Sequence, residues 1–178
     1  MKVYLIRHGE PDYTEVKAAH YVSYGREFGG LTPAGIGQAQ QRGQTLPPDI
    51  QLILTSPYTR ALQTALEIAR HTTIPVQVEL GLHEWQPDLT GTQLQTDAEV
   101  TQIYAEYQRS PTICPQNFPF QYETAPAVCE RVNAVLAKYA NDYDCLACVT
   151  HGEVMHQLTG QSTFNYCEMA TLNYPTSH

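Results

Sequence analysis

The stretch Lys2–Glu10 reads KVYLIRHGE and joins a run of β-forming residues to a polar cluster. The run Lys2–Ile6 predicts a short buried strand, because it is mostly apolar and a glycine-containing break follows it. Arg7, His8 and Gly9 come at the carboxyl end of this strand. That is the end at which α/β sheets bind their ligands.

The same design occurs at two later points of the chain. A second apolar run, Leu52–Thr55, leads into Arg60, and a third, Cys145–Val149, leads into His151. Because ligands bind outside the carboxyl ends of parallel strands, we expect these side chains to converge with those after the first strand. Segments of helical periodicity separate the strands, so the pattern predicts an α/β fold with a largely parallel sheet.

The other elements follow from periodicity and from end signals. Thr32-Pro33 and Ser56-Pro57 each place a capping residue before a proline that suits the first helical position. We expect helices over 33–45, 58–71, 97–109 and 127–139, a short helix ending near 158, and a further strand over 75–79. All 178 residues are interpreted as one domain, in which the loop excursions 12–30 and 110–126 are expected to cover the site.

Composition excludes several classes of function. Ten Lys and Arg against eighteen Asp and Glu give a net charge of −8, which argues against nucleic acids or anionic membranes as general partners. No run approaches the roughly 20 apolar residues of a membrane span, and the start MKVYLIRHGEP is too short for a signal peptide. Five scattered cysteines do not suggest a disulfide framework, so we expect a cytoplasmic protein. The sequence does not indicate an oligomeric state.

Two arginines and two histidines at the strand ends suit phosphoryl chemistry. Arg7 and Arg60 carry planar, permanently charged groups that match phosphate oxygens. Of the pair His8 and His151, one ring can attack phosphorus and the other can donate to the phosphoryl oxygens. An isolated strand-end histidine is more often structural, but the combination points to a phosphate site. No spacing matches a metal motif, and we expect neither metal nor cofactor.

Five blocks in order resemble the histidine phosphatase superfamily, in its phosphoglycerate-mutase-like branch. They span most of the chain, while 110–140 carries no block. The resemblance implies a three-layer α/β/α sandwich with a mostly parallel central sheet. The blocks are RHGE at 7–10, LTPAGIGQA at 31–39, TSPYTRALQTA at 55–65, LHE at 82–84 and VTHGE at 149–153.

The resemblance also implies roles for single residues. His8 matches the family's nucleophile, and Arg7, Arg60 and His151 match the rest of its phosphate pocket. Glu84 matches the proton donor, which would protonate the leaving oxygen and later take a proton from water. That role needs a raised pKa, which the charges of a bound phosphate favour.

Four further residues are candidates for substrate binding. Gly9 and Gly152 allow close approach of the backbone to the ligand. Glu10 either orients a pocket residue or caps its own loop. Many relatives place an Asn soon after RHGE, where it contacts phosphate; this sequence has none there, and Thr14 is the candidate substitute.

These residues predict a metal-independent phosphatase that hydrolyses a small phosphorylated metabolite through a phosphohistidine. A phosphoglycerate-type mutase is the alternative within the same family, although only Lys17 and Arg26 add positive charge near the first loop. A third reading is a non-catalytic module that binds phospho-ligands. The presence of both His8 and Glu84 argues against it, because such a module would not need them.

Overall fold

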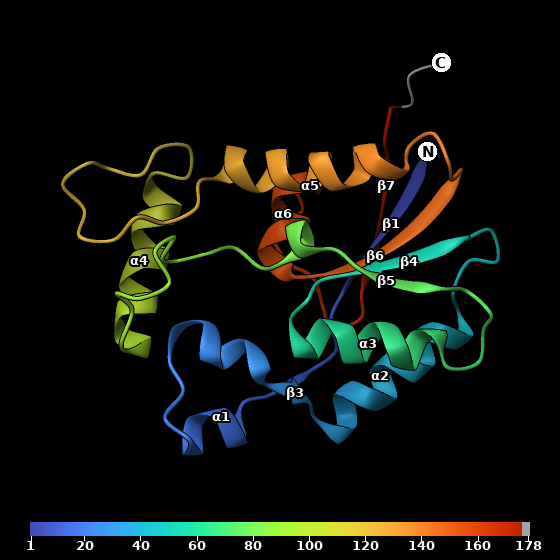
Figure 1. Cartoon of the computed structure of the whole chain (residues 1–178), viewed down its shortest axis with the longest axis horizontal. Coiled ribbons are helices and arrows are strands. Elements are labelled where there is room, and N and C mark those ends of the chain that lie inside the picture. The colour runs from blue at the N-terminus through green and yellow to red at the C-terminus, as the bar shows by residue number, and fades with distance from the viewer. Residues whose placement is uncertain (176–178) are drawn as a thin grey trace.

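The computed structural model describes residues 1–175 and contains a five-stranded sheet in the order β5-β4-β6-β1-β7 (Figure 1). The first four strands of that order are parallel, and β7 runs antiparallel to β1. The mostly parallel sheet is therefore confirmed. Its strands are β1 (Lys2–Arg7), β4 (Leu52–Thr55), β5 (Val76–Val78), β6 (Cys145–Thr150) and β7 (Met169–Asn173).

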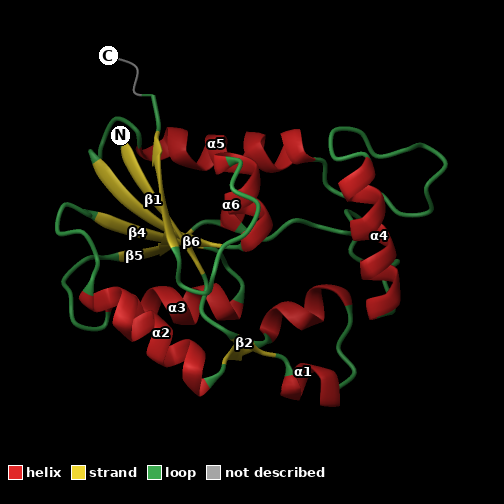
Figure 2. Cartoon of the chain, turned by 180° about the vertical axis from the view of Figure 1, so that it is seen from behind, coloured by secondary structure: helices red, strands yellow, loops and turns green. Residues whose placement is uncertain are grey.

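Helices cover both faces of this sheet, which gives the three expected layers (Figure 2). α2 (Pro33–Gln44) and α3 (Thr59–Ala69) cover one face. α5 (Ala125–Tyr139) and α6 (Gly152–Thr159) cover the other. Alternate strand residues serve the two layers, as the period of a strand requires. In β6, Leu146 packs on the α5 side and Ala147 on the α3 side.

Of the two predicted helix caps, the structure confirms one and contradicts the other. The Thr32 hydroxyl accepts a hydrogen bond from Gly35 N at 2.9 Å, so Thr32 caps α2 as predicted. The second predicted cap, Ser56, is wrong: α3 begins at Thr59, and Tyr58 is its N-cap. The Ser56 side chain lies within hydrogen-bond distance of His151 instead.

The strand β7 is absent from our sequence-based expectations, which contain no element after 158. Its residues are only half-buried or exposed, as suits the edge of a sheet, so no apolar run marks it. It pairs along β1 from Lys2 to Ile6, opposite Asn173 to Met169. The turn before it donates from Cys167 N to Arg7 O at 3.1 Å and so secures the end of β1.

Two long segments extend beyond the sheet at the end where β1 and β6 terminate (Figure 1). The first contains the ribbon β2–β3 (Pro11–Asp12 and Gly30–Leu31), α1 (Thr14–Ala18) and the 3₁₀ helix η1 (Ser23–Phe28). The second follows the 3₁₀ helix η2 (Leu80–Leu82) and includes α4 (Asp97–Arg109). Across residues 1–175, no helix is both long enough and apolar enough to span a membrane.

Candidate active site

The carboxyl ends of three adjacent strands place the predicted residues together. In the sheet, Arg7 at the end of β1 pairs with Thr150 in β6, and Thr55 at the end of β4 pairs with Val149. The segments that follow these strands therefore meet at one edge. Arg7, His8, Arg60 and His151 form what we call the strand-end cluster, and the predicted convergence holds: the rings of His8 and His151 lie 5.2 Å apart.

His8 is held as a neutral ring with an unprotonated nitrogen that faces Arg60. Its Nδ1 lies 2.7 Å from the carbonyl oxygen of Gly9, which can only accept, so Nδ1 carries the proton. Its Nε2 therefore has a lone pair, toward which Arg60 Nε donates at 3.3 Å. Burial, followed by the charge of Arg60, lowers the pKa of His8 to about 3. The geometry and the lowered pKa both leave Nε2 as a potential nucleophile.

His151 is fully buried beside His8 and starts the first turn of α6. Its Nε2 lies 2.8 Å from the hydroxyl oxygen of Ser56, and Tyr58 packs edge-on against its ring at 5.3 Å. Burial, followed by the charge of Arg60, holds the pKa of His151 well below its usual range. The Nδ1 atom of this ring has no hydrogen-bond partner.

Arg7 is the second member of the cluster with an unsatisfied nitrogen. Its guanidinium donates to the carbonyl oxygen of Phe164 and stacks on Tyr166, with 4.6 Å between the guanidinium carbon and the ring centroid. Its Nε has no partner. Among the described residues, Arg7 Nε and His151 Nδ1 are the buried side-chain polar atoms without a hydrogen bond. Buried polar groups are nearly always paired, so two in one cluster mark a place for a ligand with acceptor oxygens.

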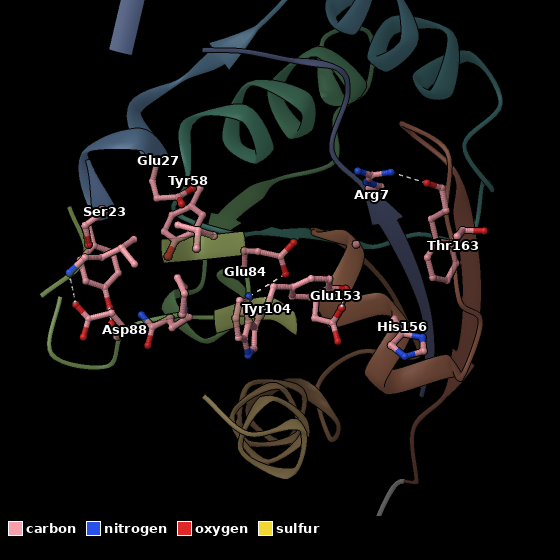
Figure 3. A pocket seen from close by; sticks show the side chains of 18 of the residues that line it. Arg7, Ser23, Glu27, Tyr58, Glu84, Asp88, Tyr104, Glu153, His156 and Thr163 are labelled. Carbon is pink, nitrogen blue, oxygen red and sulfur yellow. Dashed lines mark hydrogen bonds between the residues drawn. The ribbon is translucent and has the colours of Figure 1, made fainter. Parts of the chain in front are cut away.

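A cavity of about 530 Å³, which we call the side cavity, adjoins the cluster (Figure 3). Arg7, Glu27, Tyr58 and Gly152 line it and also contact or belong to the cluster segments. Its lining includes no residue from 110–126, whereas η1 contributes three side chains from the other predicted excursion. The excursion 12–30 therefore helps to enclose this cavity.

Glu84 lines the side cavity near the centre of the view in Figure 3, with Arg7 to one side and Tyr58 to the other. One of its oxygens accepts a hydrogen bond from Trp85 N at 2.8 Å. Burial raises the pKa of Glu84 by more than the hydrogen bond from Trp85 N and the charge of Arg60 lower it. A carboxyl group in this state holds a proton closer to neutrality than an ordinary glutamate does.

Three predicted binding residues have other positions than expected. Gly9 holds His8 rather than a ligand: its carbonyl oxygen accepts from the His8 ring, and its N–H donates to Thr64 Oγ1 at 2.9 Å. Glu10 accepts from the hydroxyl of Thr32 at 2.9 Å and so supports the cap of α2. Glu10 does not line the side cavity, and this hydrogen bond favours a capping role over the orientation of a pocket residue.

Thr14 is also not brought to the site. It is exposed at the start of α1, and its backbone N–H donates to Asp12 Oδ1 at 2.8 Å. Thr14 is not among the residues that line the side cavity, so the structure gives no support to its predicted substitution for a phosphate-binding Asn. The second predicted glycine, Gly152, does line the side cavity.

Sequence reasoning missed several residues of the site. Glu153 lines the side cavity and accepts from the hydroxyl of Tyr107 at 2.9 Å, although it ends the block VTHGE that carries part of the family resemblance. Ser56 follows the second strand and is predicted as a helix cap, and its contact with His151 is not foreseen. Glu27 carries no signal at all, because nothing in a mixed loop sequence indicates which arginine a glutamate will contact.

Glu27 forms an ion pair with Arg60 inside the cluster. Arg60 is buried, and Glu27 is partly shielded from solvent. A phosphate that binds next to His8 requires the same guanidinium, so the Glu27 carboxylate competes with it. The two further cations near the first loop do not line the side cavity: Arg26 pairs with Asp97, and Lys17 is exposed on α1.

We therefore expect Glu27→Gln to bind inorganic phosphate more tightly, with the inhibition constant lower by about tenfold, because the competing charge is gone. Competitive inhibition of turnover by phosphate measures this constant. Glu15→Gln is the matched control, since it removes the same charge from an exposed site in α1. Equal tightening in both variants, or weaker binding in Glu27→Gln, would show that Glu27 does not compete with phosphate.

Among residues 1–175, no group of three His, Cys, Asp or Glu side chains lies close enough together to hold a metal ion. Cys145 and Cys148, which share a two-residue spacing, are both buried in β6. Lys2, at the opposite end of β1, pairs with Asp49. The groups at the site that can bind a negatively charged ligand are therefore the arginines and histidines of the strand-end cluster.

Comparison with known proteins identifies the fold and the family. No curated protein matches the chain. A mycobacterial glucosyl-3-phosphoglycerate phosphatase, solved with VO3, aligns with a TM-score of 0.73 at 19% identity, covering 97% of this chain and 90% of its own. YhfR of Bacillus stearothermophilus aligns with a TM-score of 0.72 at 22% identity, covering 99% and 94%. The model of the histidine phosphatase superfamily (branch 1) matches residues 3–169, and the chain belongs to that superfamily.

Proposed function

We propose that this protein is a phosphatase that hydrolyses a small phosphomonoester through a phosphohistidine on His8. One observation carries the proposal: the neutral, buried His8 ring lies beside two buried nitrogens, Arg7 Nε and His151 Nδ1, that have no partner. With the Ser56 hydroxyl donating to His151 Nε2, the ring proton lies on Nδ1, and a phosphoryl group then has oxygens to accept from both nitrogens and a phosphorus atom for His8 to attack.

In the first step, His8 Nε2 attacks phosphorus and forms a P–N bond, while the P–O bond to the substrate alcohol breaks. Arg60 Nε, which donates to His8 Nε2 at 3.3 Å, exchanges that partner for a phosphoryl oxygen as the His8 lone pair turns to phosphorus. Arg60 Nη1 binds a second phosphoryl oxygen once Glu27 moves away. The cluster's positive charge then stabilises the oxygens as the bond order changes.

Glu84 supplies the proton that the leaving alkoxide needs. Its pKa is raised, mainly by burial, so the protonated form is available closer to neutral pH. After the alcohol leaves, the Glu84 carboxylate takes a proton from water as that water attacks phosphorus. The P–N bond breaks, inorganic phosphate forms and His8 is free again.

The cavity composition favours hydrolysis over transfer to a second hydroxyl. A mutase must retain a doubly phosphorylated intermediate, which needs cationic residues beyond the first phosphate site. Among the described residues that line the side cavity, Arg7 is the only arginine or lysine, and it belongs to the phosphate site itself. The carboxylates of Glu27, Asp88 and Glu153 line the same space.

The proposal is tested by hydrolysis of p-nitrophenyl phosphate in the presence of EDTA. We expect turnover in the chelator, since arginines and histidines provide all of the proposed charge stabilisation. Rapid quenching into alkali should preserve a phosphoenzyme, and acid should release its phosphoryl group, which is the behaviour of a phosphohistidine. Two results would overturn the proposal. One is turnover that EDTA abolishes. The other is a quench series that resolves a burst of p-nitrophenol but contains no phosphoenzyme.

A further inference from the structure

We propose that the substrate's leaving group is a bulky apolar alcohol, of the size of an aromatic ring system, that carries no negative charge. This inference rests on the proposed function, because it concerns the part of the ester that Glu84 would protonate. It comes from the walls of the side cavity rather than from the strand-end cluster. Two independent features of those walls support it: their apolar surface and the sign of their charges.

The apolar surface comes from segments that surround Glu84. Leu94, Val100 and Tyr104 contribute from the segment around α4, together with Trp85 beside Glu84 and Phe164 beside Arg7. The rings of Trp85 and Tyr104 lie 5.5 Å apart in an edge-on arrangement. Such walls stabilise a ligand mainly by removing apolar area from water, about 25 cal/mol per Å².

The cavity is also larger than a small polar alcohol requires. Its volume of about 530 Å³ lies within the range of roughly 300–1,000 Å³ found for pockets that enclose drug-sized ligands. A glycerol or glycerate group would leave most of this apolar surface in contact with water. A naphthyl-sized group would cover much more of it.

The charges around the cavity select against an anionic leaving group. Asp88 and Glu153 line it without a cationic partner among the described residues, and Glu27 lines it in its ion pair with Arg60. Arg7 is occupied by Phe164 and by the phosphate site. Tyr104 donates to Glu153 Oε2 at 3.1 Å, so a phenol hydroxyl and not a cation partners that carboxylate. A carboxylate on the substrate would meet like charge across a partly apolar space, where repulsion is only weakly screened.

The experiment compares kcat/KM for four aryl phosphates that share one reaction. 4-Carbamoylphenyl phosphate and 4-carboxyphenyl phosphate have almost the same shape and differ in charge, and we expect the carbamoyl compound to be favoured by about tenfold. 1-Naphthyl phosphate and phenyl phosphate differ in apolar area, and we expect the naphthyl compound to be favoured by about five- to tenfold.

A variant pair links the preference to the cavity wall. Tyr104→Ala removes one aromatic side of the cavity from an exposed position of α4, and should lower the naphthyl-to-phenyl ratio at least about threefold. Gln102→Ala is the control, because Gln102 is exposed on the same helix and does not line the cavity. In that variant the ratio should stay at the wild-type value.

The outcomes separate this inference from the proposed function. If phosphoenzyme forms but the carboxyphenyl ester is used as well as the carbamoyl ester, the inference is wrong and the phosphatase proposal stands. A naphthyl-to-phenyl ratio near one, or equal ratios in wild type and Tyr104→Ala, also overturns it. If none of the four esters yields phosphoenzyme or phosphate, the proposed function itself fails.

Discussion

Replacing His8 with Ala or Asn will lower kcat for p-nitrophenyl phosphate by about 10⁴-fold or more, because the proposed nucleophile is lost. His8 is the ring whose Nε2 is unprotonated and faces Arg60. No other described nucleophile has this position: His151 Nε2 already lies against the Ser56 hydroxyl. The measurement is steady-state hydrolysis together with phosphoenzyme trapping, and both signals should disappear.

Loss of activity is informative only if the variants fold. His8 is buried, so truncation to Ala leaves a void, whereas Asn retains an amide that can still donate to the Gly9 carbonyl. Thermal unfolding of both variants and of wild type controls for this difference. His71→Ala, which removes an exposed histidine after α3, should keep wild-type activity. A folded His8→Asn protein with more than about a tenth of wild-type turnover would exclude His8 as the nucleophile.

Glu84→Gln will have an effect that depends on the leaving group. For glycerol 2-phosphate, whose alkoxide is a poor leaving group, we expect kcat/KM to fall by about 10²- to 10⁴-fold, because the proton donor is gone. For p-nitrophenyl phosphate, whose phenolate leaves without a proton, kcat/KM should fall less than about tenfold. Glu130→Gln changes an exposed carboxylate on α5 and should alter neither value.

The pH dependence gives a second test of Glu84. Burial raises its pKa, so the carboxyl group keeps its proton to a higher pH than usual and loses it as pH rises through that raised value. In wild type, kcat/KM for glycerol 2-phosphate should therefore decrease on the alkaline side of that pKa. The wild-type to Glu84→Gln ratio cancels the ionisation of the substrate phosphate, and this ratio should fall with rising pH. A ratio independent of pH, or equal losses for both esters, would rule out the donor role.

The convergence of the strand-end cluster could be predicted from the sequence because it needs only local patterns and one rule of topology. Apolar runs end at Arg7, Thr55 and Thr150, and parallel strands place such ends at one edge. The full order of the five strands was not needed for this conclusion, only that these three are neighbours. Any arrangement that kept these three strands adjacent would have brought the polar clusters together.

Local patterns failed where a side chain had two partners available. Ser56 precedes a proline, as a cap does, yet its hydroxyl lies against His151, which is 95 residues away along the chain. Glu10 sits beside the cluster in sequence, but its carboxylate bonds to Thr32. In both cases the hydrogen-bond partner comes from a distant segment, and no local pattern indicates which hydrogen bond forms.

The side cavity depends even more on the tertiary structure. Its walls combine η1, the segment around Glu84, α4 and the turn before β7, which are dispersed over most of the chain. The aromatic residues that line it have no spacing in common. Their chemistry as a leaving-group site arises only because the two extensions beyond the sheet fold toward its carboxyl edge (Figure 1).

The sequence by itself determined the α/β fold with its largely parallel sheet and the four residues of the strand-end cluster. Strand and helix periodicities are local, and parallel strands bring the loops that follow them to one edge of the sheet. The tertiary structure alone decided that Glu27 contacts Arg60, that Glu84 is shielded enough for its pKa to rise, and that an apolar cavity adjoins the phosphate site. The contacts, burial and charge at these places come from residues that are distant in sequence, and only the folded chain brings those residues together.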